Sequence, residues 1–381
     1  MRFLAEAWQR QPVLFRGAFP GFIPPLSVDE VAGLACEEEI ESRLVLERDG
    51  ATPWEVRHGP FGDDDFAGLP DSHWTILVQD VDKWIPDAAR LLDGFRFVPD
   101  WRIDDLMISI AGDQGSVGPH WDDYDVFLIQ GAGRREWRID ERAVTADNRL
   151  PDVPLRIMRD FKTSRSWVLK AGDMLYLPPR LAHHGVALGD GCMTLSVGFR
   201  APSQSELLDD LLNERLLGER SPRFQDPQRS GGNNPGLIDA ASIRDLRALI
   251  ESATKLAPDD FAAWLGGFLT RAKPGIALVP LEEEPPTVES VHDWLRTSPE
   301  WHRDGAARLA FIPAGTDGNH DHHAFVNGKA LALADDELAL FEALCATTRY
   351  ASDALIALTP TPRGRALLGR LIGEGLLNAP E

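Results

Sequence analysis

The chain has 381 residues, of which 43% are hydrophobic, and its 60 acidic and 39 basic side chains give a formal net charge of −21. This length allows a large core and more than one domain. The acidic balance argues against direct binding of nucleic acid and indicates a basic partner. Three cysteines without paired spacing exclude a disulfide framework. No apolar run is long enough to cross a membrane, so we expect a soluble cytoplasmic protein.

The first two hundred residues contain many short β-type runs separated by Gly, Pro and Asp turns. Such a series predicts a β-sandwich or a closed barrel. The runs lie at residues 43–48, 52–59, 74–81, 106–111, 124–131, 135–140, 166–172, 173–179 and 192–199.

Two of these regions carry metal-ligand residue types. His120 and Asp122 are two positions apart in a segment that we interpret as a strand, where residues i and i+2 share a face. Further along the chain, we interpret the Gly-Asp-x-x-Tyr-x-Pro-Pro run as a strand that ends in His183, and the Pro-Pro step favours His183 over His184 as the third ligand. Two histidines and one carboxylate suit Fe(II) with open coordination positions. A buried core histidine and a turn aspartate are the alternative reading.

A cationic residue follows the metal motif. Arg134 and Arg135 begin a strand after a Gly-Ala-Gly turn, so one side chain faces inward and the other outward. An inward arginine can bind a carboxylate through two charge-assisted hydrogen bonds. Asp122, Asp123 and Asp125 also surround the motif, and together they would attract a cationic substrate. The acidic runs at 37–39 and 63–65 are better explained as solvated surface.

Helical periodicity begins after Pro202. Helices are predicted from Ser203 onward, over 241–256 and over 259–272, with a loop at 221–236. The first helix has a leucine stripe that fits either intramolecular packing or a pairing surface. This stripe consists of Leu207, Leu208, Leu211, Leu212 and Leu216.

A proline-rich linker at 275–290 leads into a terminal region of helices and short strands. A hairpin turning at Asn327-Gly328 makes this region winged-helix-like. Its few clustered basic residues favour a protein-contact or scaffold role over DNA binding. The tract from Gly318 to His323 holds three histidines and is a competing metal candidate. We expect no physiological site there, because the sequence around the tract offers neither a supporting carboxylate nor a strand context.

Five segments together carry a family resemblance. They are QPVLFRGAFPGF, PDWRIDDLMISIAGDQGSVGPH, PHWDDYDVFLIQGAGRREWRI, GDMLYLPPRLAHHGVAL and TLSVGFRAPS. With these motifs the chain resembles the JmjC-type Fe(II)/2-oxoglutarate oxygenases, and within them the bacterial ribosomal oxygenases that hydroxylate an arginine of a large-subunit ribosomal protein. The resemblance is strong over the first two hundred residues and rests on general layout beyond them.

The resemblance implies an α+β fold. Residues 1–202 would form a double-stranded β-helix, the jelly-roll or cupin-like JmjC domain, residues 203–273 a helical dimerisation region, and residues 274–381 a winged-helix-like domain. The protein would be a homodimer whose other partner is a basic ribosomal protein.

The resemblance also implies a role for each candidate site residue. His120, Asp122 and His183 would bind Fe(II) and act in catalysis. Arg135 would hold the distal carboxylate of 2-oxoglutarate, where many JmjC enzymes have lysine, helped by Ser109 and more weakly by Ser196; ordinary backbone bonding is the alternative for both serines. O2 would be the second cosubstrate, and succinate and CO2 the co-products. Tyr124 and Asp123 would bind the substrate arginine.

Two other functions remain open at this stage. A cupin-like module that binds a metal without turnover is disfavoured by Arg135, because a metal store needs no anchor for 2-oxoglutarate. A JmjC demethylase would use the same iron chemistry on a methyl group, and fold analogy does not exclude it.

Overall fold

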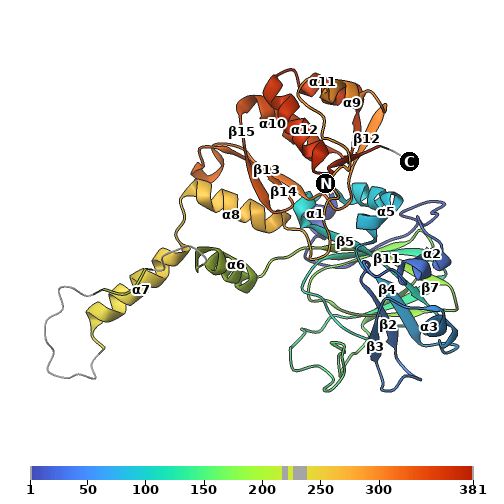
Figure 1. Cartoon of the computed structure of the whole chain (residues 1–381). Helices are drawn as coiled ribbons and strands as arrows, with labels where there is room; N and C mark the ends of the chain where they lie inside the picture. Colours follow the sequence, from blue (N-terminus) through green and yellow to red (C-terminus); the bar gives the residue numbers. More distant parts are fainter. Residues whose placement is uncertain (1, 217–221, 226–237, 380–381) are drawn as a thin grey trace.

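The computed structural model describes residues 2–216, 222–225 and 238–379 (Figure 1). Most of the predicted loop at 221–236, and the side chain of Leu216 in the predicted stripe, lie outside the described part. The structure is of the α+β class, as predicted from the sequence. A β-rich half holds the amino-terminal residues and is called the amino-terminal half below, and a mixed helical and β-sheet unit holds the carboxyl-terminal ones (Figure 1).

The amino-terminal half is built on two antiparallel sheets. The larger sheet has the strand order β1-β9-β6-β11-β5-β4-β2-β3, and the smaller one has the order β10-β7-β8. The strands of the larger sheet are β1 Val13–Phe15, β2 Ser42–Leu46, β3 Glu55–His58, β4 Trp74–Val78, β5 Ile103–Ala111, β6 Val126–Ala132, β9 Met174–Leu177 and β11 Cys192–Phe199. Those of the smaller sheet are β7 Arg134–Asp140, β8 Arg165–Lys170 and β10 Ala182–Ala187.

Alternation along the central strands divides the side chains between two environments. On β5, Ile108 and Ile110 enter the main hydrophobic core. Ala111 of the same strand instead packs with Cys192 and with Ala187 of the smaller sheet. Because side chains alternate, Ser109 shares the face of Ala111 and points into the space between the two sheets. This space, called the inner face below, holds the candidate site.

Short helices cover the outer face of the larger sheet. Val31, Val81 and Phe95 from these helices pack into the main core with the outward side chains of β5 and β11. The helices are α1 Arg2–Glu6, α2 Val28–Leu34, α3 Asp63–Ala67, α4 Val81–Trp84, α5 Pro86–Leu91 and the 3₁₀ turns η1 Leu92–Phe95 and η2 Asp100–Arg102. The outer face is thus filled by core packing, which leaves the inner face to hold polar groups.

In the described part of the chain, three helices follow the amino-terminal half: α6 Gln204–Leu216, α7 Ala240–Thr254 and α8 Pro258–Thr270. In Figure 1, α7 projects away from the body of the molecule, and it has no buried residue. By contrast, α8 packs on the sheet β13-β14-β15. The predicted division at residues 202 and 273 stays a prediction, and α8 packs across the second of these boundaries.

The carboxyl-terminal unit combines two small sheets with four helices. Its strands are β12 Glu300–Arg303, β13 Leu309–Ile312, β14 His322–Val326, β15 Lys329–Leu333, β16 Arg349–Ala351 and β17 Leu377–Asn378. Its helices are α9 Val291–Leu295, α10 Asp335–Ala346, α11 Ser352–Leu358, α12 Pro362–Gly373 and the 3₁₀ turn η3 Thr316–Gly318. The β14–β15 hairpin turns at Asn327 and Gly328, which both have positive φ, as the Asn-Gly pair predicted.

A charged junction joins the two halves. Arg303 contacts Asp100 at 2.8 Å. Arg308 donates to the backbone carbonyl of Ile103 at 3.1 Å. Lys273 lies 3.0 Å from an oxygen of Asp80. The carboxyl-terminal unit therefore contacts the first residue of β5 and the turns before this strand. Within the described ranges, no helix has the length and apolar character that a membrane span requires.

Candidate metal centre

Backbone hydrogen bonds bring the three predicted ligands together. His120 and His183 form an isolated antiparallel bridge, in which each backbone N–H donates to the other's carbonyl, at 3.0 and 2.8 Å. Asp122 lies two residues beyond His120, and its carbonyl accepts a 2.6 Å hydrogen bond from the N–H of Arg180. The segment before β10 is thus tied at two points to the segment that carries His120 and Asp122.

This arrangement corrects two expectations. His120 and Asp122 do not lie on a regular strand: His120 makes only the single bridge, and Asp122 follows it in a loop before β6. His183 does not end the Gly-Asp-x-x-Tyr strand, because β9 stops at Leu177 and a turn leads into a separate strand, β10. Proline at 178 and 179 explains the break, since proline donates no ladder hydrogen bond.

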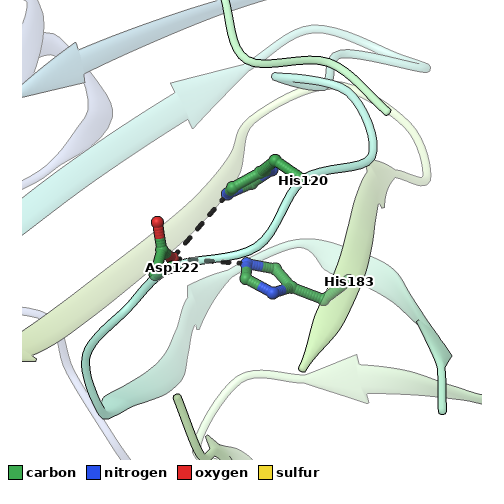
Figure 2. Close-up of side chains that lie close together, drawn as sticks. All are labelled: His120, Asp122 and His183. Carbon is green, nitrogen blue, oxygen red and sulfur yellow. Dashed lines mark ion pairs between the residues drawn. The ribbon is translucent and has the colours of Figure 1, made fainter. Parts of the chain in front are cut away.

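The ligand atoms of the three side chains converge (Figure 2). The Nε2 atoms of His120 and His183 lie 3.9 and 3.7 Å from Oδ2 of Asp122. Among the described residues, this is the one group of three or more candidate ligands whose atoms all lie within 4.8 Å of one another. Spacings of this size leave room for an ion between the atoms, because metal–ligand bonds are about 2 Å long.

Hydrogen bonds set the tautomer of both rings. Nδ1 of His120 lies 2.9 Å from the carbonyl oxygen of Gly118, and Nδ1 of His183 lies 3.0 Å from that of Leu181. A carbonyl only accepts, so each Nδ1 carries the proton and each Nε2 presents a lone pair. Burial also lowers the pKa of His183, to about 4, and the nearby His120 adds to the effect. Both features suit neutral metal-binding imidazoles.

His184 points away from this cluster. Its ring contacts Phe161, with the ring centroids 5.9 Å apart. Burial lowers the pKa of His184 to about 4, with a further contribution from Arg138. The geometry therefore favours His183, as the Pro-Pro step did.

Arg135 lies on the inner face, whereas Arg134 is exposed. Arg135 is 2% exposed, and its Nε and Nη2 have no hydrogen-bond partner. Its cross-strand neighbour Ala187 packs with Ala111 of β5, two positions after Ser109. A buried guanidinium with unsatisfied donors is costly, so its position indicates an anionic ligand.

The two predicted serines are also on the inner face. Ser109 and Ser196 are 5% and 7% exposed. The hydroxyl of Ser109 makes only a long 3.5 Å hydrogen bond, to the carbonyl of Thr194. It therefore remains able to donate to a ligand.

The predicted substrate-binding residues lie at the surface of the site. Tyr124 is 42% exposed. Withdrawal of its hydroxyl from water raises its pKa, and the nearby Asp122 carboxylate adds to the shift. Asp123 lies 3.5 Å from Arg180.

The position of Asp125 contradicts the prediction that all three aspartates around the motif attract a cationic substrate. It is fully buried and accepts hydrogen bonds from the hydroxyl of Tyr176 at 2.6 Å and from Nε2 of Gln9 at 2.9 Å. Its carboxylate therefore anchors the loop to the core and does not face a substrate.

The histidine tract has partners that the sequence reading missed. Asp259 of α8 lies 2.9 Å from Nδ1 of His320 and 3.3 Å from Nε2 of His323. His322 contacts Asp335 instead. His322 and His323 also lie on β14, so the expected lack of a carboxylate and of a strand was wrong. The contacts with Asp259 tie β14 and the turn before it to α8, and the atoms of the tract do not converge as those of the triad do.

Sequence reasoning also missed Trp137. It lies two positions after Arg135 on the same face of β7 and is 6% exposed, and its Nε1 has no hydrogen-bond partner. Its ring lies 5.9 Å from that of His183. The spacing of two from Arg135 was the signal that could have identified it.

The residues present fit the metal and the cosubstrate that the resemblance implies. Two neutral imidazoles and one carboxylate, all partly or fully withdrawn from water, match the donor set of non-haem iron. The unsatisfied donors of Arg135 match an anionic group held further inside.

Comparison with known proteins agrees with this geometry. The family model described as JmjC domain matches residues 90–207, and the one described as ROXA-like winged helix matches residues 245–378. The ribosomal protein uL16 3-hydroxylase of Escherichia coli (strain K12) is 37% identical over 371 residues, which cover 96% of this chain and 91% of that protein. A probable ribosomal oxygenase of Haemophilus influenzae is 37% identical over 55% of this chain and 51% of that protein.

Solved structures extend the similarity to the whole fold. The X-ray structure of E. coli YcfD matches with a TM-score of 0.85 and 34% identity, covering 99% of this chain and 97% of that one. The structure of YcfD, a ribosomal oxygenase, in complex with cobalt and 2-oxoglutarate matches with a TM-score of 0.82 and the same identity and coverage. The similarity thus covers both the amino-terminal half and the carboxyl-terminal unit of this chain.

Proposed function

Because the chain belongs to the JmjC-domain ribosomal oxygenases with a ROXA-like winged helix, we propose that it hydroxylates an arginine side chain of a large-subunit ribosomal protein. It is a metal- and 2-oxoglutarate-dependent oxygenase, with Fe(II) as the metal and succinate and CO2 as co-products. One observation carries the proposal: a converging triad of two histidines and one aspartate opens onto the same inner face as a buried arginine with unsatisfied donors.

The chain's own residues prepare the site for this chemistry. Iron with 2-oxoglutarate supplies the activation of O2 that C–H hydroxylation needs. His120 and His183 offer neutral Nε2 atoms because backbone carbonyls hold their Nδ1 protons. Asp122 adds the negative charge, and three protein ligands leave coordination positions free. The hydrophobic side chains of the inner face around Trp137 and Ile139 exclude water.

We assign the distal carboxylate of 2-oxoglutarate to Arg135. A carboxylate placed against its Nε and Nη2 would satisfy both unpaired donors in a two-point contact. Ser109 adds a hydroxyl from the facing strand. Ser196 lies on the same face of β11, and we assign it the weaker, supporting role.

The substrate side is proposed from charge and exposure. A net charge of −21 favours association with a basic ribosomal protein. Tyr124 is the exposed aromatic beside the triad and can stack on a guanidinium, while Asp123 can pair with its charge. The substrate arginine would therefore enter over the loop of residues 121–125. Ribosomal proteins are made and assembled in the cytoplasm of bacteria, and we place the protein there.

We further propose that the protein is a homodimer that pairs through its helical region. Ile243, Leu246 and Ile250 form a stripe at helical spacing along α7, and they are 48%, 41% and 72% exposed. Such a stripe on a projecting helix is typical of a protein-protein contact.

Reconstituted turnover tests the proposed function. The purified protein is incubated with Fe(II), 2-oxoglutarate and ribosomal proteins from cells that lack it, and succinate and intact masses are measured. We expect succinate to form together with one added oxygen atom on an arginine of one large-subunit protein. Succinate without any added oxygen would remove the substrate assignment, and loss of a methyl group in its place would support a demethylase.

A further inference from the structure

Beside Arg135, the inner face holds a buried donor that the proposed function does not yet use. The indole Nε1 of Trp137 is buried without a hydrogen-bond partner, in a residue that is only 6% exposed. An indole N–H can only donate, and a buried donor without an acceptor is costly. Buried indole N–H groups usually find a partner. The unsatisfied N–H therefore indicates an acceptor that the bound state supplies.

The position of the ring is fixed from one side. Trp137 is paired with Gly185 of β10, and a Cβ at Gly185 would lie 2.6–2.9 Å from the six-membered ring. Gly185 thus provides the space in which this end of the indole rests. The nitrogen belongs to the five-membered ring, away from these contacts. The side chain can present its N–H without moving the ring.

The surroundings identify the acceptor. The guanidinium carbon of Arg135 lies 5.8 Å from the centroid of the Trp137 ring. Arg135 itself has two unpaired donors, so three unsatisfied N–H groups lie in one small region of the inner face. A carboxylate has room for about four hydrogen bonds and can take all three. The apolar neighbours of Trp137 in this layer, such as Ile139 and Leu169, offer no acceptor of their own.

We propose that Trp137 is a 2-oxoglutarate-binding residue whose indole N–H donates to the distal carboxylate beside Arg135. The inference rests on the proposed function and adds a neutral donor to the anchor. Arg135 supplies charge and Trp137 supplies direction, since a single fixed N–H selects one orientation of the carboxylate plane.

Binding to a protein loaded with a metal that does not turn over tests this role. The affinities of Co(II)-loaded wild type and Trp137→Phe are measured by calorimetry for 2-oxoglutarate and for 2-oxopentanoate, which has a methyl group in place of the distal carboxylate. We expect the substitution to lower the affinity for 2-oxoglutarate by about tenfold to a hundredfold, the range for a hydrogen bond to a charged group. The affinity for 2-oxopentanoate should stay unchanged.

Trp167→Phe is the matched control. Trp167 is paired with Trp137 on β8 and packs on the same apolar cluster, but its nitrogen is not among the buried unsatisfied atoms. This control should bind 2-oxoglutarate as the wild type does. If Trp137→Phe lowers the affinities for both ligands equally, or lowers neither, the proposed hydrogen bond does not exist. If the wild type itself fails to bind 2-oxoglutarate, the proposed function fails as well, which is a different result.

A measurement on the unaltered chain covers the case in which Trp137→Phe does not fold. In Zn(II)-loaded protein with ¹⁵N-labelled tryptophan, the indole N–H signal of Trp137 should move downfield on addition of 2-oxoglutarate. It should not do so with 2-oxopentanoate. An indole signal that is unmoved by 2-oxoglutarate overturns the proposal.

Discussion

The metal centre depends on hydrogen bonds that turn ordinary histidines into oriented ligands. Carbonyls two residues before His120 and His183 accept from their Nδ1 atoms, and both Nε2 atoms are thereby directed to Asp122. The bridge between the two backbones fixes the distance between the rings. The backbone of Asp122 is held by the hydrogen bond that its carbonyl accepts from the N–H of Arg180. The site thus needs both segments in place before a metal can bind.

Replacement of Asp122 tests the carboxylate ligand. Asp122→Ala should weaken metal binding by more than the roughly 10- to 100-fold that changes in outer-shell partners cause, and turnover should be lost. Asp123→Ala is the matched control for metal affinity alone, because this neighbour is exposed and does not belong to the triad. Calorimetric titration with Co(II) measures both. Equal metal affinity in the two variants would contradict the assignment.

The anchor arginine has an equally close control. Arg135→Ala should raise the KM for 2-oxoglutarate at least about 30-fold, since loss of a buried charged partner costs about 2 kcal/mol or more. Metal affinity should change little. Arg134→Ala, one position away and facing solvent, should behave as the wild type. Steady-state kinetics with metal titration separates the effects, and a similar loss in both variants would place the anchor elsewhere.

Residue types were easier to predict than their settings. The sequence identified His120, Asp122 and His183, because few residue types bind metals and their spacing was informative. It placed them on the wrong elements. A single bridge holds His120. We predicted that Asp125 faces the substrate, but it is buried and accepts a hydrogen bond from Tyr176. Side-chain direction in a loop depends on distant contacts that no local pattern contains.

At the scale of elements, periodicity performed well where strands were long. The runs that became β2, β4, β5, β6, β7 and β11 were all predicted. The separate strand β10 was missed, because His183 and His184 interrupt its apolar pattern and it begins directly after a turn. The short strands β12, β16 and β17 were missed as well, since two to four residues carry too little alternation to be recognised.

The projecting helix α7 gives an element-scale prediction. Ile243→Glu together with Ile250→Glu should convert a dimer into a monomer, because two buried carboxylates would face an apolar partner surface. Ala248→Glu, on another side of the same helix, should leave the dimer intact. Sedimentation velocity measures the mass of each variant. A wild type that is already monomeric at micromolar concentration would contradict the proposed pairing.

At the scale of the whole molecule, the junction between the halves is charged throughout. A cavity of about 650 Å³ lies beside it, lined by residues of both halves such as Arg96, Asp100 and Arg303. The cavity is not at the metal centre and contains none of its ligands. Sequence could not predict the junction, since Asp100 and Arg303 are about two hundred residues apart and no local pattern links them.

Asp105 gives the junction a pH dependence of its own. Burial raises the pKa of Asp105 from 3.8 to about 7, despite the nearby Lys273, and Asp104, Asp80 and Asp82 add to the shift. Between about pH 4 and about pH 7, Asp105 keeps its proton in the folded protein but has lost it in the unfolded chain. Raising the pH from about 4 to about 7 therefore lowers the contribution of Asp105 to the free energy of unfolding, by at most about 1.4 kcal/mol for each pH unit.

Asp105→Asn should therefore stabilise the protein at pH 8 and have a smaller effect at pH 5. Asp104→Asn is the control with the opposite sign, because Asp104 pairs with Arg200 at 3.0 Å and with Lys273 at 3.3 Å. It should destabilise the protein at pH 8. Urea unfolding at both pH values provides the free energies. A less stable Asp105→Asn at pH 8 would show that pairing with Lys273 outweighs the cost of burying the carboxylate, and would contradict the raised pKa of Asp105.

The central claim is that this chain adds oxygen to one ribosomal protein by means of its metal triad. The most direct test compares the intact masses of all ribosomal proteins from cells with the wild-type chain and from cells with only Asp122→Ala. We expect one large-subunit protein to carry one additional oxygen, on an arginine, in the wild type alone. Identical masses in the two strains would contradict the account.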